Sequence, residues 1–368
     1  MITVFYGPDK EFAKIIPPKI RPKTLTQLLE ESDINSRKII VTDNSGDKIK
    51  PPKSNISNLT IKSHEYSRLS DSGLNGFITI FNKYRIENMY VQNPPNIILS
   101  QLRDFYDKIE IIEHNYRSIE NNDVNKFFNS YDDVIFGQTK AKDKILLQIY
   151  QLSKKYNKNK PLVLLFYGPT GVGKTETAKF LSDLMGENLF RKQFSMYQNI
   201  EFANYVFGGK HTEACLARDL LERESNVILF DEFDKANNLF YSAFYQMFDE
   251  GVFEDKHYKV NLKNSIIICT SNFLNINDVK NTLGNAIYSR IDCVVEFKPL
   301  DNEAAEKLIK LTFDEIYSEL VDDDKNIIKK EEMLSTLLPY SKELYNARQI
   351  NKLVRDFVLT YITNKIFN

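Results

Sequence analysis

One short stretch of the chain combines the residue types that bind phosphate. Gly168-Pro169-Thr170-Gly171-Val172-Gly173-Lys174-Thr175 is a complete GxxxxGK[ST] pattern. Its glycines let backbone N–H groups surround a phosphate, Lys174 would reach the β- and γ-phosphates, and Thr175 would bind a magnesium ion. A plain glycine-rich turn is the alternative, but chance produces this string in about one chain of this length in a hundred. The stretch predicts a site for ATP and Mg²⁺.

A second stretch supplies two carboxylates directly after an apolar run. Asn226-Val227-Ile228-Leu229-Phe230-Asp231-Glu232 reads as a strand that delivers both acids at its carboxyl end, where open α/β sheets bind ligands. Asp231 is suited to hold Mg²⁺, and Glu232 to polarise an attacking water as a general base. The alternative is a solvated turn at the end of a strand, which can carry the same two acidic residues. The pair predicts hydrolysis because it accompanies the phosphate loop.

Apolar strands that alternate with helices would position both stretches. Near-continuous apolar runs separated by helices indicate a parallel sheet covered on both faces. The helix after Gly173 has apolar residues at helical spacing. The expected strands are Leu162–Tyr167, Leu189–Phe194, Val227–Phe230, Ser265–Thr270 and Val294–Phe297.

The rest of the chain divides into two further regions. The pattern of residues 1–125 predicts a small α/β domain. Residues 299–368, which begin with Pro299-Leu300, are helical in pattern and predict a small helical domain. Residues 126–298 then form the central domain. In the first region we expect strands at Ile2–Tyr6, Lys38–Thr42 and Ile109–Glu113, a helix at Asn96–Tyr106 and a polar surface loop at Asp43–Asn58. In the last region we expect helices at Ala304–Leu320, Lys329–Leu337 and Ala347–Ile366.

The opening Phe5-Tyr6-Gly7-Pro8 repeats the letters of Phe166-Tyr167-Gly168-Pro169. No Gly-Lys-Thr follows the first copy, and a strand that ends in a Gly-Pro turn is common. We interpret the repetition as a coincidence and not as a second phosphate loop.

Three segments in order carry a family resemblance. Asp231-Glu232-Phe233-Asp234-Lys235-Ala236 resembles the DEIEKA segment of Clp-type AAA+ ATPases, and it is followed by similar Gln246–Gly251 and Lys263–Asn272. The resemblance covers about residues 130 to 360 and is to the second-ring module of the heat-shock Clp disaggregases. It implies an AAA+ P-loop parallel sheet sandwiched by helices, followed by a small helical lid.

The resemblance also implies roles for single residues. Asn272 matches the sensor-1 position, and Arg290 matches the finger that reaches the γ-phosphate bound by a neighbouring subunit, unless it forms a surface ion pair with Asp292. Arg348 matches the sensor-2 arginine of the lid, or is an ordinary exposed helix arginine. Ile135 matches the turn that packs against adenine, or belongs to a buried apolar hinge.

Other segments depart from the family. Glu201–Lys210 is shorter than the GYVG pore-loop segment, so Tyr205 is either a remnant that grips a threaded polypeptide or a buried or docking aromatic residue. The coiled middle domain is absent. Thr282-Leu283-Gly284-Asn285 stands where an I-G-[FL] loop would precede Arg290. Docking to a Clp protease chamber is therefore not supported.

Composition limits the remaining function classes. Forty-nine Lys and Arg face 50 Asp and Glu, so nucleic acid is not indicated as a partner. Cys215, Cys269 and Cys293 are too far apart for a metal site and suit a reducing compartment. The chain opens without a secretory signal, and its apolar runs are too short to span a membrane, so we expect a cytoplasmic protein with no membrane partner.

The leading hypothesis is a ring-forming Mg-ATP hydrolase, by family analogy a hexamer, that remodels a protein client or effector recruited by residues 1–125. One alternative is an ATP-gated switch or scaffold in a signalling or defence complex. A weaker alternative is a DNA-directed AAA+ loader, which would require a basic face.

Overall fold

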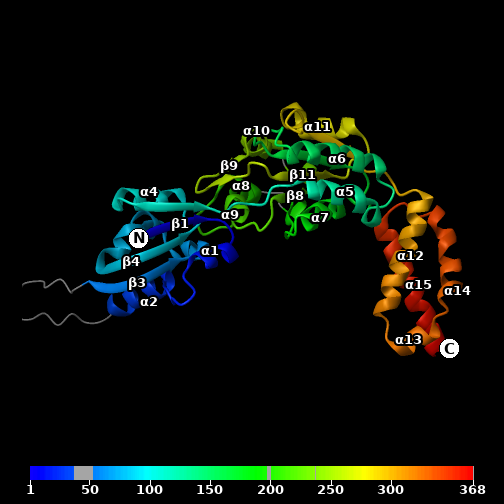
Figure 1. The fold of residues 1–368 in the computed structure, drawn as a ribbon, viewed down its shortest axis with the longest axis horizontal. Coiled ribbons are helices and arrows are strands. Elements are labelled where there is room, and N and C mark those ends of the chain that lie inside the picture. The colour runs from blue at the N-terminus through cyan, green and yellow to red at the C-terminus, as the bar shows by residue number, and fades with distance from the viewer. Residues whose placement is uncertain (37–52, 197–199, 237, 368) are drawn as a thin grey trace, which may run out of the picture. The chain divides into compact units, whose positions relative to one another are not determined.

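The computed structural model describes residues 1–36, 53–196, 200–236 and 238–367. The chain forms two compact units, in each of which segments distant in sequence come together (Figure 1). The first comprises Met1–Tyr116, Asn199–Glu224 and Val252–Asn261, and the second comprises Arg117–Gln198, Ser225–Gly251 and Leu262–Asn368. The predicted domain limits at residues 125 and 298 stay predictions.

The second unit contains the predicted parallel sheet. Its order is β12-β6-β11-β8-β7, and every neighbouring pair is parallel. The strands are β6 (Leu162–Tyr167), β7 (Phe190–Gln193), β8 (Val227–Asp231), β11 (Ile266–Ser271) and β12 (Cys293–Glu296). Their ends differ from the expected ones by at most one residue. The α/β fold class is confirmed.

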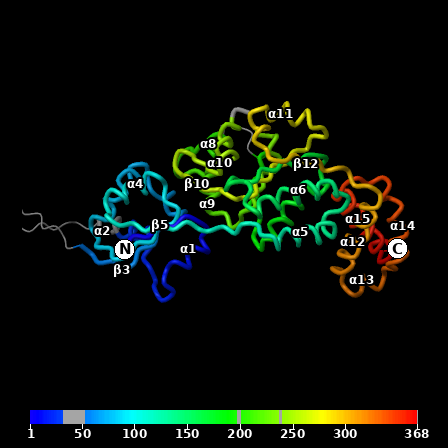
Figure 2. Tube along the Cα trace, turned by 45° about the horizontal axis from the view of Figure 1, so that its top comes forward, coloured from blue at the N-terminus to red at the C-terminus, as the bar shows by residue number. Residues whose placement is uncertain are grey.

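Helices cover both faces of this sheet. Leu164 and Phe166 of β6 share a core cluster with Ala178 and Leu181 of helix α7, because alternate residues of a strand point to one face. Helices α5 and α6 join the same cluster, and α11 lies on the opposite side of the sheet (Figure 2). The helices are α5 (Asn121–Val134), α6 (Thr139–Ser153), α7 (Lys174–Leu184), α10 (Tyr245–Glu250) and α11 (Ile276–Tyr288).

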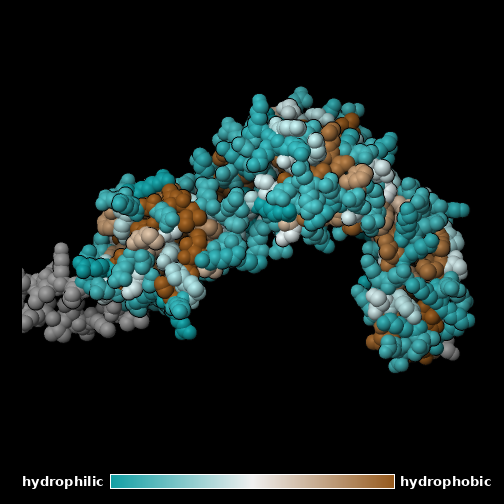
Figure 3. Space-filling view, viewed as in Figure 1, coloured by the Kyte–Doolittle hydropathy of each residue, from teal (hydrophilic) through white to brown (hydrophobic). Residues whose placement is uncertain are grey.

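A helical lid follows β12. Its helices are α12 (Asn302–Glu319), α13 (Asp322–Ile327), α14 (Lys330–Leu337) and α15 (Ala347–Phe367). The three expected helices are present, whereas α13 was not predicted, since none of its side chains is buried and its sequence has no apolar stripe. Phe313 of α12 and Val354 of α15 belong to one buried cluster. Figure 3 shows the surface of the lid as mainly hydrophilic, with some hydrophobic patches.

The first unit holds another parallel sheet, of order β2-β3-β4-β1-β5. Its strands are β1 (Ile2–Tyr6), β2 (Lys23–Thr24), β3 (Ser54–Ile61), β4 (Tyr84–Gln92) and β5 (Ile109–Glu113). Helices α2 and α4 share a core cluster with Val4 and Met89 on one face of the sheet. Phe12 of α1 packs with Phe5 and Tyr90 on the other face. The helices are α1 (Asp9–Ile15), α2 (Leu25–Ser36), α3 (Asp71–Asn75) and α4 (Asn96–Phe105).

Sequence reasoning captured this sheet only in part. The strands at Ile2–Tyr6 and Ile109–Glu113 and the helix that begins at Asn96 are confirmed. The expected loop over Asp43–Asn58 is wrong for its last residues, because Ser54–Ile61 pairs along β4 with Ile56 buried. The strand expected at Lys38–Thr42 lies outside the described residues.

The rest of the first unit comes from between strands of the second sheet. It consists of α8 (Ile200–Phe207), α9 (Leu216–Leu221) and the antiparallel pair β9 (Val252–Glu254) and β10 (Lys259–Asn261).

Short 3-10 helices occur in both units. They are η1 (Ser63–Arg68), η2 (Phe77–Lys83), η3 (Phe194–Met196), η4 (Phe233–Lys235), η5 (Asn238–Phe244) and η6 (Leu338–Lys342).

The two FYGP segments occupy the same place in the two sheets. Each follows the strand that lies second from one edge, β1 or β6, and each of these strands pairs with the fourth and fifth strands of its own sheet. The repeated letters therefore mark equivalent positions in two sheets of the same strand order, and their interpretation as a coincidence is wrong.

No helix within the described ranges is both long and apolar enough to cross a bilayer.

Candidate functional site

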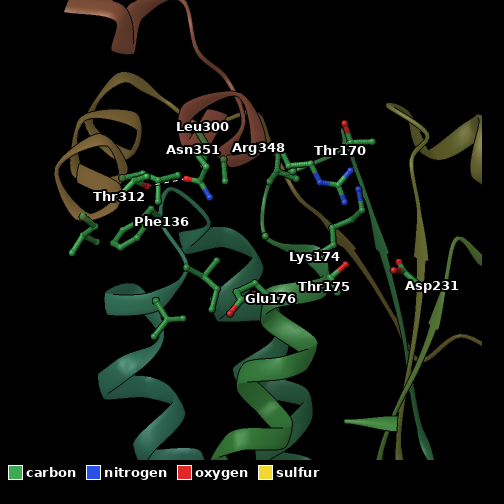
Figure 4. Close-up of a pocket in the computed structure, with 18 of the residues that line it drawn as sticks. Phe136, Thr170, Lys174, Thr175, Glu176, Asp231, Leu300, Thr312, Arg348 and Asn351 are labelled. Atoms are coloured by element: carbon green, nitrogen blue, oxygen red, sulfur yellow. Dashed lines mark hydrogen bonds between the residues drawn. The ribbon is translucent and has the colours of Figure 1, made fainter. Parts of the chain in front are cut away.

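A cavity of about 870 Å³ opens in the second unit at the carboxyl ends of the strands (Figure 4). Its volume is within the usual range of small-molecule sites, roughly 300 to 1,000 Å³. The lining comes from the phosphate loop and adjacent helix start (Thr170–Glu176), the segment before α6 (Asp133–Phe136), the strand ends (Arg191, Gln193, Asp231, Glu232, Asn272) and the lid (Leu300, Leu308, Leu311, Thr312, Glu315, Ala347, Arg348, Asn351). Residues from seven separate stretches of sequence thus surround one cavity.

The phosphate loop joins β6 to the N-terminus of α7. Gly168 has a φ of 139°, and a Cβ there would lie 2.0 Å from the carbonyl oxygen of Phe297, so glycine alone fits. Gly171 and Gly173 also have positive φ angles. The turn places backbone N–H groups and the positive end of an 11-residue helix at the cavity, which favours an anion.

Lys174 connects this loop to the neighbouring strand. Its Nζ donates to the carbonyls of Gly168 at 2.6 Å and Pro169 at 2.7 Å, and to Oδ1 of Asn272 at 3.1 Å. Burial lowers the pKa of Lys174 to about 8, although the nearby Asp231 carboxylate opposes this shift. The structure thus brings the phosphate-loop lysine and the predicted sensor asparagine into direct contact.

Asp231 lies at the end of β8 with both carboxylate oxygens engaged. Oδ1 accepts from the hydroxyl of Thr270, and Oδ2 accepts from Nε of Arg191 at 3.1 Å and from its Nη2. Sequence reasoning missed Arg191. The available signal was its place in the expected strand Leu189–Phe194, where Arg191 and Gln193 alternate and so point to one face.

Glu232 is held in a left-handed backbone conformation, with φ at 54°. Such a conformation is uncommon for a residue other than glycine and often marks a functional position. Its N–H donates to Thr270 Oγ1 at 2.9 Å, and its carboxylate accepts from Gln193 at 3.3 Å and Asn272 at 3.5 Å. Two amide side chains from adjacent strand ends therefore orient this carboxylate towards the cavity.

The lid contributes Arg348 and a backbone contact to the loop. Arg348 lines the cavity and lies beside Lys174 (Figure 4). The positive charge of Arg348 helps to lower the pKa of Lys174. The N–H of Ala347 donates to the carbonyl of Gly171 at 2.7 Å. The preceding Asn346, which stands where the family has glycine, accepts from the N–H of Gln349 at 2.9 Å and so caps α15.

Ile135 lies between α5 and α6 and lines the cavity. Only 3% of it is exposed, and it both packs in the core cluster of the second unit and lines the cavity. The position fits a surface for an adenine ring and fits a buried hinge, so its role stays a prediction.

Arg290 is not among the residues that line this cavity. Its Nε donates to Asp249 Oδ2 at 2.8 Å, and its guanidinium lies 4.5 Å from the ring centre of Tyr245. The ion pair with Asp292 that we considered is wrong, because Asp292 instead accepts from the N–H of Val163 at 2.7 Å at the edge of β6.

Tyr205 is buried in α8 with 4% of its surface exposed. Its hydroxyl donates to Asp219 at 2.7 Å. Of the alternatives considered, this arrangement agrees with a buried aromatic residue and not with one displayed on a loop to grip a polypeptide.

Comparison with known proteins places this architecture in a family. Residues 159–322 match the family described as AAA domain (Cdc48 subfamily). Chaperone protein ClpB of Malacoplasma penetrans (strain HF-2) is 28% identical over 305 residues, which are 72% of this chain and 42% of that protein. ATP-dependent Clp protease ATP-binding subunit ClpL of Staphylococcus aureus (strain MRSA252) is 33% identical over 257 residues, or 62% of this chain and 36% of that protein. The chain thus spans less than half the length of these relatives.

A solved structure described as a closed-state reconstruction of Hsp104 with ATPyS and FITC casein has a similar fold. The TM-score is 0.57 with 15% identity, over 99% of this chain and 88% of that chain.

A parallel P-loop sheet, a lid and a cavity between them define the AAA+ class. Residues 159–322 thus carry an AAA domain, and the chain resembles the Clp-type AAA+ ATPases and a module of their disaggregases.

Proposed function

We propose that the chain binds ATP with Mg²⁺ in the cavity of the second unit and hydrolyses it to ADP and phosphate. The observation that carries this proposal is the convergence of the phosphate loop, Asp231, Glu232 and Asn272 on one cavity. Clp-type relatives include one whose name describes an ATP-binding subunit.

Each residue has a distinct part in this proposal. Backbone N–H groups of the phosphate loop and Lys174 hold the β- and γ-phosphates. Thr175 and Asp231 hold Mg²⁺, which neutralises charge on the phosphate oxygens when bound. Asp231 supplies a carboxylate and Thr175 a hydroxyl at the cavity, and such oxygen ligands are those that Mg²⁺ prefers.

Glu232 orients the attacking water and accepts its proton. Asn272 positions both Glu232 and Lys174, since it bonds to each of them. Arg348 brings a lid cation to the phosphates, so that nucleotide binding and the lid position depend on one another.

We further propose that the chain works as a ring, by family analogy a hexamer. Arg290 lies outside the cavity formed by its own chain, which is the arrangement expected of a residue that completes the site of a neighbouring subunit. ATP hydrolysis in such a ring would remodel a protein partner, as the chaperone name of one relative suggests, and we expect this to occur in the cytoplasm.

The test is the variant Glu232→Gln, in which the shape of the site is kept and the base is lost. We expect Mg-ATP binding to remain within about threefold of the unmodified chain, and hydrolysis to fall by about 10² to 10⁴. Held with ATP, the variant should also retain its protein partner in a pulldown. Normal turnover by this variant would remove Glu232 from the mechanism, and a lack of nucleotide binding by the unmodified chain would overturn the proposal.

A second candidate is an ATP-gated switch or scaffold that assembles with a partner and threads no polypeptide. The burial of Tyr205 favours it, because a gripping residue must be exposed. The two candidates are separated by measuring whether the active chain translocates a fluorescently labelled unfolded protein: translocation supports remodelling by threading, and ATP-dependent assembly without translocation supports the switch.

A further inference from the structure

The sheets of the two units have the same topology. If the strands of each sheet are numbered in chain order, both sheets run fifth, first, fourth, third, second, and all neighbours are parallel. In the second unit this arrangement carries the phosphate loop after its first strand, β6. The equivalent position in the first unit is the turn after β1.

The correspondence extends to individual residues around that turn. Tyr6 pairs with Glu113 on the fifth strand, just as Tyr167 pairs with Glu296. The next residue of each fifth strand donates its N–H back to the tyrosine carbonyl, at 2.7 Å in the first unit and 2.8 Å in the second.

The glycine that follows has the same role in both units. Gly7 and Gly168 have φ angles of 153° and 139°. A Cβ on Gly7 would lie 2.5 Å from Cβ of His114, and one on Gly168 would lie 2.0 Å from the carbonyl oxygen of Phe297. Both turns therefore require glycine for the same reason, which is close packing against the end of the fifth strand.

In the first unit, the position that corresponds to the phosphate site is occupied by groups of the protein itself. Helix α1 begins at Asp9, directly after Pro8, so the four loop residues that separate Pro169 from α7 have no counterpart. The N–H of Gly7 donates to Oδ1 of Asn93 at 2.9 Å, and Nδ2 of Asn93 donates to the Gly7 carbonyl at 2.9 Å. Asn93 is fully buried. The amide at the start of this turn is therefore already bonded within the protein.

The metal position carries the opposite charge in the first unit. The last paired residues of the third and fourth strands are Ile61 and Val91 in the first unit and Phe230 and Cys269 in the second. One residue beyond these pairs stand Lys62 and Gln92 in the first unit and Asp231 and Thr270 in the second, and Gln92 and Thr270 pair with Phe5 and Phe166. Lys62 thus stands where Asp231 would be. Its Nζ forms an ion pair with Asp9 at 2.9 Å. A lysine at this place repels Mg²⁺.

Residues 1–116 of the first unit instead pack against the segment 200–224 of the same unit, which lies between β7 and β8 in sequence. His211 Nε2 donates to the carbonyl of Leu69 at 2.6 Å, and the His211 side chain is almost fully buried. The hydroxyl of Tyr116 donates to the Arg223 carbonyl at 3.1 Å, and the Arg223 guanidinium stacks 3.7 Å from the ring centre of Tyr116.

We propose that residues 1–116 of the first unit are a second copy of the P-loop fold that binds no nucleotide, and that this copy serves to hold the segment 200–224 of the same unit in place. The chain then has one nucleotide site, in the second unit, although it contains two sheets of this topology. The segment that would carry a mobile pore loop in the Clp-type family is anchored by this copy.

The first test counts nucleotide sites on the full chain by calorimetric titration with the slowly hydrolysed analogue ATPγS and Mg²⁺. We expect one site per chain, and no saturable binding by Lys174→Ala once its fold is verified by circular dichroism. Two sites per chain, or one site that persists in Lys174→Ala, would overturn the inference. A lack of binding by the unmodified chain contradicts the proposed function and leaves the first unit as described, so the two failures are distinguishable.

The second test concerns the anchored segment and uses hydrogen exchange on the full chain. Tyr116→Ala should speed amide exchange in peptides from residues 200–224 by at least about tenfold, because it removes a bond and a stacking contact that oppose local opening. Phe105→Ala, at an exposed aromatic residue of the same unit, is the matched control and should leave these peptides unchanged. Unchanged exchange in Tyr116→Ala would show that the copy does not hold the segment.

Discussion

Arg290 and Asp249 form an ion pair in which Nε of the arginine lies 2.8 Å from Oδ2 of the aspartate. Asp249 belongs to the family-like segment Gln246–Gly251, and Arg290 matches the finger arginine of the family, yet neither lines the cavity of its own chain. The pair holds the guanidinium at the surface, where 27% of its side chain is exposed. This position is compatible with a cation that serves the site of a neighbouring copy.

Replacement of Arg290 tests this directly. Arg290→Ala should reduce steady-state ATP hydrolysis by about 10³ or more, because a finger arginine stabilises charge in the transition state, while nucleotide binding changes little. Phosphate release and analogue titration measure the two effects.

A mixing experiment decides whether Arg290 acts between chains. Arg290→Ala and Glu232→Gln are each expected to be inactive, but in a mixed ring an intact Glu232 can lie next to an intact Arg290 of the other variant. Mixing should therefore restore part of the activity. If the mixture stays inactive although both variants assemble, the proposed role in trans is contradicted.

Arg191 should control the demand for Mg²⁺. It donates two hydrogen bonds to Oδ2 of Asp231, a carboxylate that we propose would hold Mg²⁺. Since Arg191 is 46% exposed, the pair is worth at most about 1 kcal/mol. Arg191→Ala should lower the Mg²⁺ concentration for half-maximal hydrolysis by about threefold, as measured by a Mg²⁺ titration.

Arg191→Lys keeps the charge and serves as the control, with a smaller shift expected. A higher Mg²⁺ requirement in Arg191→Ala would show that the guanidinium assists metal or phosphate binding instead of competing with it.

Tyr205 should contribute to stability. Because its ring is buried, Tyr205→Ala should lower the free energy of unfolding by about 3 to 5 kcal/mol, and Tyr205→Phe, which loses only the bond to Asp219, by about 1 kcal/mol. Chemical denaturation measures both. Phe207→Ala, at a residue 43% exposed in the same helix, should have a smaller effect. An unchanged stability in Tyr205→Ala would contradict the burial.

Asn346 should stabilise the lid as the cap of α15. Asn346→Ala should lower the free energy of unfolding by about 1 kcal/mol. Asn346→Gly, which restores the family residue, should lower it by only a few tenths of a kcal/mol. Thermal unfolding of the two variants, compared with the unmodified chain, gives the order. Equal losses in both variants would contradict the role of Asn346 as a cap.

The sequence by itself determined the second sheet and the central part of the site. The strands β6, β8 and β11 are uninterrupted apolar runs, and such runs can only be buried on both faces, so local composition was enough to predict them. Lys174, Asp231, Glu232 and Asn272 follow these runs, at the carboxyl ends where parallel strands open to ligands. Their convergence on one cavity follows from that geometry.

The tertiary structure alone decided the partners of these residues and the nature of the first unit. Arg191 is 40 residues from Asp231 in sequence, so their ion pair depends on strand order and not on any local pattern. Polar and apolar residues are mixed in β3 and β4, and only part of each strand is buried. Their local composition therefore does not identify them as strands of a parallel sheet. Only the register of these two strands with β1 reveals a second P-loop fold, in which Lys62 stands in the place of an aspartate.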